Sequence, residues 1–253
     1  MKNISIFLLA VLFMACKSET DTPELIGDVI INKAIDASGV DVLKNAKVSF
    51  DFRGTQYLAN RNNGQFVLAR VFLSDTNDSI FDVLSNDGFE RFVNDEKVQL
   101  PDTLIAKYTP SVNSVHYFSV LPYGLNNKAV NKFLIGKEII KNTNYHKVKV
   151  TFDEEGGGED FEDVFIYWIN SETYNIEYLA YSYAESDGQG LRFREAYNAR
   201  NIEGVKIVDY NNYKPNDESV ELKSLGKLFE SGQLQLLSKI ELENVEIDLI
   251  DNL

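Results

Sequence analysis

Alternating hydrophobic and polar residues dominate the chain from about residue 48 onward. Val48, Phe50 and Phe52, for example, alternate with polar neighbours. A period of two places every second side chain on the same face of a β-strand, so the pattern predicts strands with one buried face. Besides 48–52, the predicted strands cover 65–73, 80–84, 89–93, 132–141, 145–153, 163–170, 175–184, 190–200, 205–213 and about 238–249.

Short turn sequences connect these strands. Asn62-Asn63-Gly64 and Asn86-Asp87-Gly88 are typical of β-hairpins, because asparagine, aspartate and glycine accept the backbone angles of tight turns. Strands joined by short turns pair in antiparallel fashion. A sheet of about ten or eleven strands curls as a result of its twist. We therefore expect a mainly β (α+β) fold, in which a single large curled antiparallel sheet forms an unclosed barrel.

Three segments break the alternation and have helical spacing instead. Apolar residues repeat every three or four positions over 29–38, and Gly39 is placed to end this helix. A second helical segment lies over 101–120 and is predicted to be split at Pro110, because proline removes a helix hydrogen bond. We expect this middle segment to act as a lid over the sheet. A third helix is predicted over 222–231.

The beginning of the chain has a pattern of its own. A basic start with Lys2 precedes an almost unbroken apolar run from Ile4 to Ala15. This run is shorter than the roughly 20 residues that a membrane-spanning helix needs. A charged start, a short apolar run and a small final residue are typical of a secretory signal peptide. We therefore expect a signal peptide over 1–15.

Cys16 is the only cysteine and follows Phe13-Met14-Ala15. This arrangement resembles the lipobox of bacterial lipoproteins, in which the cysteine thiol receives a diacylglycerol. The alternative is an ordinary signal peptide with an incidental cysteine. On the lipoprotein interpretation, 16–27 form a lipidated tether and 28–253 form a single domain. The protein would then lie in the cell envelope, anchored to the outer membrane on its periplasmic or surface face.

Composition excludes several functional classes. The chain has 39 acidic and 25 basic residues, which gives a net charge of −14. Binding to nucleic acid depends on clustered cations, and none are present, so we expect no nucleic-acid partner. With two histidines and no free thiol after lipidation, a zinc site is not expected. No sequence typical of a nucleophile is found, so we predict no catalytic set, no metal and no cofactor.

Two titratable residues lie on faces that are otherwise apolar. His146 shares a face with Val148 and Val150, where it is either a ligand or base, or a core histidine with satisfied hydrogen bonds. Glu195 shares a face with Phe193 and Tyr197. A carboxylate in such surroundings requires a partner, for which Arg70, His146 and neighbouring tyrosines are candidates, and a structural role is the alternative.

Several phrases of the chain resemble a family of bacterial lipoproteins of unknown function, over about residues 28–215. The phrases are His116-Tyr117-Phe118, Leu121-Pro122-Tyr123-Gly124-Leu125, Tyr145-His146-Lys147-Val148-Lys149-Val150-Thr151-Phe152, Tyr167-Trp168-Ile169-Asn170 and Arg192-Phe193-Arg194-Glu195-Ala196-Tyr197-Asn198. At the level of the fold, the order of elements resembles the LolA/LolB-like lipoprotein carriers. That resemblance implies an unclosed barrel around an apolar cavity, with helices as a lid.

Three functional hypotheses follow. The first is a membrane-anchored protein that binds an apolar or amphiphilic ligand, such as a lipid, in a half-barrel cavity. The second is a structural or interaction subunit of an envelope complex without a ligand. The third is an acid–base hydrolase that uses Glu195 and a histidine. The candidate ligand-binding residues are His116, Tyr123, His146, Trp168, Arg194, Glu195 and Tyr197.

Overall fold

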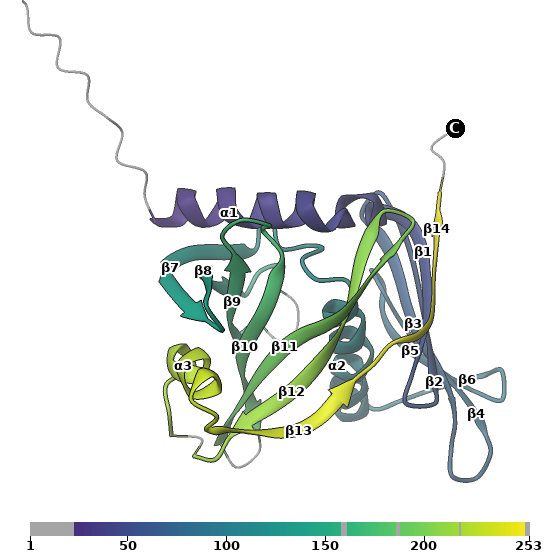
Figure 1. Ribbon diagram of the computed structural model, residues 1–253. Helices are drawn as coiled ribbons and strands as arrows, with labels where there is room; N and C mark the ends of the chain where they lie inside the picture. Colours follow the sequence, from purple (N-terminus) through teal and green to yellow (C-terminus); the bar gives the residue numbers. More distant parts are fainter. Residues whose placement is uncertain (1–22, 158–160, 186–187, 218, 251–253) are drawn as a thin grey trace, which may run out of the picture.

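Two antiparallel sheets of seven strands each form the body of the protein (Figure 1). The computed structural model describes residues 23–157, 161–185, 188–217 and 219–250. In spatial order, sheet A consists of β14 (Glu243–Leu249), β1 (Asn45–Phe52), β2 (Thr55–Asn62), β3 (Gln65–Leu73), β4 (Ser79–Ser85), β5 (Gly88–Val93) and β6 (Glu96–Val98). In the same manner, sheet B consists of β13 (Leu234–Ile240), β12 (Val205–Pro215), β11 (Gly188–Ile202), β10 (Ile176–Glu185), β9 (Val164–Asn170), β8 (Thr143–Phe152) and β7 (Val130–Ile140).

The chain passes from one sheet to the other between β13 and β14. The single strand predicted over 238–249 is therefore interrupted, and its two halves belong to different sheets. At the crossing, the buried backbone N–H of Leu242 donates a hydrogen bond to Asp209 Oδ1 at 3.0 Å. The mainly β, antiparallel and unclosed architecture is confirmed. The described residues contain fourteen strands in two sheets, in place of the expected ten or eleven in one.

Helix α1 (Pro23–Ser38) lies across one end of both sheets and packs against β7 (Figure 1). It ends where predicted, at Gly39, whose φ of 70° suits a residue without a Cβ. It begins earlier than predicted, with proline at the first helical position, where the missing N–H has no helical partner to lose. Residues 23–27 of the tether predicted over 16–27 are thus helical, and 16–22 lie outside the described residues.

Helix α2 (Asp102–Ser119) stands between the two sheets and contacts β3, β4 and β5 (Figure 1). The predicted split at Pro110 is wrong, because the helix continues through this residue. Just before the proline, Thr109 Oγ1 donates to the Ile105 carbonyl at 2.9 Å. The helix is therefore a wall inside the half-barrel. No helix in the described part of the chain is long and apolar enough to cross a membrane.

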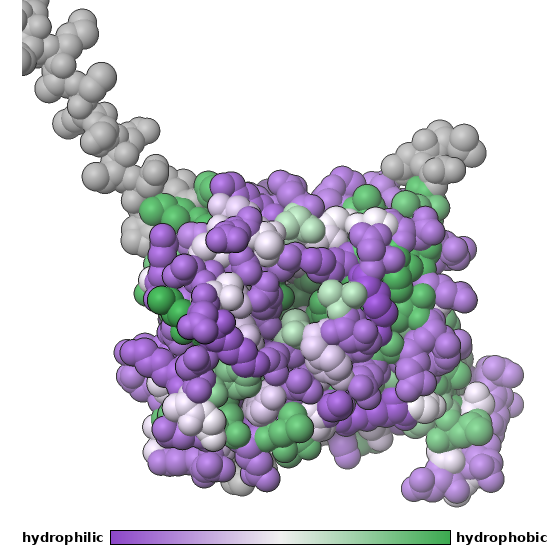
Figure 2. All heavy atoms as spheres, viewed as in Figure 1, coloured by the Kyte–Doolittle hydropathy of each residue, from purple (hydrophilic) through white to green (hydrophobic). Residues whose placement is uncertain are grey.

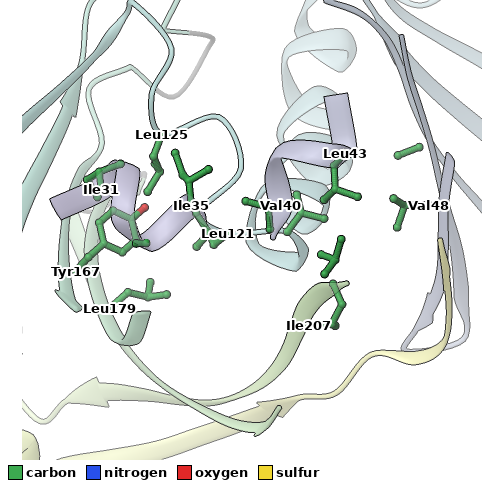
Figure 3. Packing of buried hydrophobic residues seen from close by; sticks show 14 of the residues in the cluster. Ile31, Ile35, Val40, Leu43, Val48, Leu121, Leu125, Tyr167, Leu179 and Ile207 are labelled. Carbon is green, nitrogen blue, oxygen red and sulfur yellow. The ribbon is translucent and has the colours of Figure 1, made fainter. Parts of the chain in front are cut away.

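The main hydrophobic core fills the space between the sheets beneath α1 and the short helix η1 (Val40–Lys44). Figure 3 shows Ile31 and Ile35 of α1 directed toward Tyr167 and Leu179 of sheet B. It also shows Val40 and Leu43 of η1 beside Val48 of β1 and Ile207 of β12. Helices α1 and η1 therefore close one end of the half-barrel, because they bury apolar side chains of both sheets.

A second, smaller core lies on the opposite face of sheet B. Two short helices, η2 (Leu222–Ser224) and α3 (Leu225–Glu230), cover this face. Buried apolar residues fill the interface, namely Ile140, Tyr145, Ile166, Trp168, Tyr178, Ala180, Leu191, Phe193 and Leu225. Sheet B is consequently buried on both faces over β8 to β11, which explains why 164–169 is apolar without interruption.

Candidate functional site

A cavity of about 410 Å³ lies between β2 and β3 of sheet A and the nearest part of sheet B. Helix α2 forms one wall, and the segment that follows it forms another. Its apolar lining consists of Phe66, Leu68, Tyr117, Val120, Tyr123, Val130 and Phe152. The volume lies within the range of about 300–1,000 Å³ that small-molecule sites occupy.

The cavity has a buried interior and an exposed rim. Leu68, His116 and Val120 are buried, whereas Gln65 and Asn127 are exposed. The cavity thus reaches the surface near the turn between β2 and β3. Such a space, apolar inside and open at one end, can hold a hydrocarbon group while the rest of a ligand remains near water.

His116 fixes α2 to sheet A from within this cavity. Its Nε2 donates to the Ala69 carbonyl at 3.0 Å, because a carbonyl oxygen can only accept. The ring packs edge-on against Phe50 and Tyr57. Burial lowers the pKa of His116 to about 4, and the charge of Arg61 contributes to the same shift. His116 is therefore neutral at neutral pH and holds the wall of the cavity in place.

The next residue along α2 fixes the helix to the other sheet. The hydroxyls of Tyr117 and Tyr167 lie 2.7 Å apart in a hydrogen bond. Burial raises the pKa of both phenols, so both remain neutral. His116 and Tyr117, which are neighbours on one helix, thereby connect sheet A and sheet B.

Arg61 and Tyr123 both line the cavity and are in contact with each other. The guanidinium carbon of Arg61 lies 5.1 Å from the centre of the Tyr123 ring, in a cation–π contact. Arg61 is only 7% exposed, and its Nη1 has no hydrogen-bond partner. Burial lowers the pKa of Arg61 from its ordinary value. Of the residues predicted from sequence, His116 and Tyr123 are the two that this cavity brings together.

His146 lies apart from this cavity, close to α1. As predicted, it shares a face with Val148 and Val150. Its ring stacks on Tyr174, and its buried Nδ1 has no hydrogen-bond partner. Burial, followed by the charges of Lys137 and Lys33, lowers the pKa of His146.

Arg194 also faces the space between the sheets, in a smaller cavity of about 50 Å³. Its guanidinium carbon lies 3.6 Å from the centre of the Phe118 ring, and its Nη2 donates to the Tyr181 hydroxyl at 2.8 Å. These contacts connect β11 to α2 and to β10. The residue is 8% exposed. A cavity of this size is too small for a drug-sized ligand, so Arg194 belongs to the packing around α2.

Trp168 and Glu195 lie on the outer face of sheet B, beneath α3. Strand register places Trp168 opposite Tyr178, and Tyr178 opposite Glu195, so all three share one face. Trp168, named above as a candidate ligand-binding residue, is fully buried in this second core and does not line the cavity between the sheets. Its neighbour Tyr167 takes the inner position instead.

Glu195 has the partners that its surroundings require, although they are not the arginine or histidine proposed from the sequence. Lys141 Nζ lies 2.5 Å from its carboxylate, and Asn211 and Tyr213 donate to the other oxygen at 3.1 and 3.2 Å. Arg70 pairs with Asp82 instead. Glu195 of β11 is thus connected to β12 and to the turn after β7 on the outer face of sheet B, which is a structural arrangement.

The remaining candidates lie elsewhere. The Tyr197 hydroxyl donates to Glu241 at 2.7 Å, next to the crossing between the sheets. Cys16, with the predicted signal peptide, lies outside the described residues. His146 pairs in register with Ile169, on the opposite face of sheet B from Glu195. The acid–base pair of the hydrolase hypothesis is therefore not assembled. Within the described ranges, no three acidic, histidine or cysteine side chains are grouped to hold a metal.

The sequence interpretation missed Arg61, because β2 was not predicted as a strand. A signal was present, since Tyr57, Ala59 and Arg61 occupy alternate positions and are all buried. An arginine on the buried face of a strand is uncommon and is typically explained by a partner or a function.

Replacing Glu195 by glutamine is expected to lower the free energy of unfolding by about 1–3 kcal/mol, because the variant loses a charge-assisted hydrogen bond to Lys141. Urea unfolding of both proteins measures the difference. Ligand binding per folded molecule should stay unchanged, since the residue lies outside the half-barrel. A variant of native stability that no longer binds ligand would contradict the structural role.

The face of the protein seen in Figure 2 is mostly hydrophilic, as expected for a chain with many charged residues. Figure 2 also shows hydrophobic residues gathered beside β1 and β14. Exposed apolar residues of sheet A include Val67 and Leu249. The hydrophilic surface contrasts with the largely apolar lining of the cavity.

Comparison with solved structures finds distant similarities. A LolA superfamily protein from Nitrosomonas europaea is 12% identical, with a TM-score of 0.46, over 89% of this chain and 94% of that one. A putative outer membrane lipoprotein-sorting protein domain from Vibrio parahaemolyticus is 8% identical, with a TM-score of 0.40, over 81% and 97%. The lipoprotein LppX from Mycobacterium tuberculosis is 12% identical, with a TM-score of 0.29, over 65% and 90%.

Among curated proteins, none matches the chain. The model of a family of unknown function, DUF6503, matches residues 2–242, which is nearly the whole sequence. The resemblance to a family of unknown function, noted above from the phrases around His116, Tyr145, Tyr167 and Arg192, is thereby confirmed. The chain belongs to the DUF6503 family.

Proposed function

We propose that the protein is a lipid-anchored protein of the cell envelope that binds an apolar or amphiphilic ligand between its two sheets. The observation that carries this proposal is the cavity of about 410 Å³, which is lined mainly by apolar side chains and open at one end. Cores of ordinary proteins are packed closely and leave few voids larger than a water molecule. A cavity of this size inside a half-barrel therefore favours a ligand over a purely structural role.

The binding proposal can be tested with N-phenyl-1-naphthylamine, a neutral apolar dye that fluoresces when it leaves water. We expect saturable binding to the protein and weaker binding to the Leu68→Phe variant, because Leu68 lines the cavity and a larger ring would fill it. Leu73→Phe is the matched control on the same strand, since Leu73 is 68% exposed. Absence of saturable binding to the native protein would favour the structural or interaction role.

The anchoring proposal rests on the sequence Phe13-Met14-Ala15-Cys16 and on the apolar run before it. Replacing Cys16 by serine removes the thiol that would carry the lipid. The variant is expected to appear in the soluble fraction or as an uncleaved precursor, whereas the native protein fractionates with membranes. Cell fractionation followed by intact-mass measurement checks this. A processed Cys16→Ser protein that stays with the membrane would contradict a lipid anchor, and protease treatment of intact cells separates the surface from the periplasmic face.

A further inference from the structure

The partly and fully buried arginines of the two sheets differ in their partners. Arg70 and Arg91 both pair with Asp82, and Arg200 pairs with Asp209. Arg61 is more deeply buried than these three, yet no carboxylate pairs with it in the described part of the chain. Arg194 is buried without a carboxylate as well, but its guanidinium donates to the Tyr181 hydroxyl and lies over the Phe118 ring. A buried cation without a counter-ion is costly, so natural proteins rarely keep one unless an anion arrives from elsewhere.

The surroundings of Arg61 suit an anion. Among the described residues that line the cavity, none is aspartate or glutamate, although the chain contains 39 acidic residues. The polar lining near the open end consists of the amides of Gln65, Asn113 and Asn127, which can donate hydrogen bonds. The N–H groups on Nη1 of Arg61 are free to donate to a ligand, because nothing in the described structure accepts a hydrogen bond from this atom.

We propose that Arg61 binds the acidic group of an amphiphile whose hydrocarbon part lies in the cavity. The inference rests on the proposed binding function and specifies the class of ligand, which is a carboxylate or a phosphate with an attached alkyl chain. A guanidinium presents parallel N–H donors that match the oxygens of either group. The ring of Tyr123 lies against the guanidinium and limits its orientation, while Phe66, Leu68 and Val130 supply apolar surface for the chain.

Binding of matched single-chain amphiphiles tests the proposal. The probes are dodecanoate, dodecyl phosphate and the neutral dodecanol, each measured by displacement of N-phenyl-1-naphthylamine at equal ionic strength. We expect both anions to bind at least about tenfold more tightly than dodecanol, which corresponds to one charge-assisted hydrogen-bonded contact. In Arg61→Gln, the affinities of the anions should fall to that of dodecanol, while dodecanol itself binds as before.

Arg194→Gln is the matched control, because Arg194 is also buried and has no carboxylate partner among the described residues, but lines the smaller cavity. It should keep the preference for the anions. Loss of the preference in Arg194→Gln, and not in Arg61→Gln, would overturn the assignment to Arg61. The fold of each variant is checked by circular dichroism.

Arg61→Lys serves as a second variant, because it keeps the positive charge and loses the planar guanidinium. It should retain part of the preference for the anions over dodecanol.

The outcomes of these binding measurements distinguish the proposed binding function from the proposed role of Arg61. If dodecanol and the anions bind equally well to the native protein, the cavity holds apolar ligands and the role of Arg61 is refuted. If none of the three binds, the proposed function itself fails. Acetate and inorganic phosphate should not displace the dye at millimolar concentration, and displacement by them would indicate a site for free anions instead. With the native protein alone, the preference for dodecanoate should also vanish as pH falls below the pKa of its carboxyl group.

Discussion

Replacing Trp168 by alanine is expected to lower the free energy of unfolding by about 3–5 kcal/mol, the usual cost of removing a large buried aromatic side chain. Trp168 is fully buried, packs edge-on against Phe193 at 5.5 Å between ring centres, and lies beneath α3. A Cβ built on Gly226 of α3 would come within 2.8 Å of the indole, so the helix packs directly on it. Denaturant unfolding followed by circular dichroism measures the loss.

Trp168→Phe is the control for this experiment. It keeps an aromatic ring and removes an indole N–H that has no hydrogen-bond partner, so its cost should be clearly smaller. Because Trp168 is the only tryptophan, native fluorescence should show the blue-shifted emission of a dry indole. A cost for Trp168→Ala below about 1 kcal/mol, or the emission of a hydrated indole, would contradict a packed core beneath α3.

Asp82→Asn is expected to cost about 3–5 kcal/mol, because it leaves two arginines without their counter-ion in a buried site. The Asp82 carboxylate is fully buried and accepts hydrogen bonds from Arg70 Nε at 2.8 Å and from Arg91 Nε at 2.6 Å. These three residues lie side by side on β3, β4 and β5. Arg91 in turn stacks on Tyr108 of α2, so the network connects sheet A to the helix.

Asp87→Asn is the matched control, since Asp87 is an exposed residue in the turn of the same hairpin. Its effect on the free energy of unfolding should stay within about 0.5 kcal/mol. Equal effects of the two substitutions, measured by urea unfolding, would show that the Asp82 network contributes little.

Most strands could be predicted from the sequence, because alternation and turn residues are local signals. The hairpin of β4 and β5 around Asn86-Asp87-Gly88 is an example. The strand β2 was missed because its buried positions include the small Ala59 and the charged Arg61, which weaken the apolar alternation. Arg61, the residue that distinguishes the cavity, therefore lies on a strand with a weak alternation of apolar and polar positions.

The division into two sheets could not be predicted from local pattern. The sequence from β13 to β14 continues to alternate through Leu242, as one strand would. At the break, the N–H of Leu242 donates a hydrogen bond to Asp209, which lies 33 residues earlier in the chain. Contacts between residues so distant in sequence leave no periodic signal.

Only part of the candidate site could be predicted from the sequence, again because alternation is a local signal. Alternation correctly placed Glu195 on a face with the aromatic residue Phe193, but it does not indicate which face is inside the half-barrel. Helix α3 covers the outer face with apolar residues, so that face is as apolar as the inner one. His116 and Tyr123 reached the cavity because α2 and the following segment lie within the half-barrel.

The central claim is that the cavity between the sheets binds an amphiphile through Arg61. Native mass spectrometry of the protein purified from the membranes of the cells that produce it tests this claim most directly. The account predicts a species with one bound molecule, identified after release as an acidic lipid or fatty acid, and a much smaller share of this species in Arg61→Gln. Finding the bare protein alone, or a neutral lipid bound equally by native and variant protein, would contradict it.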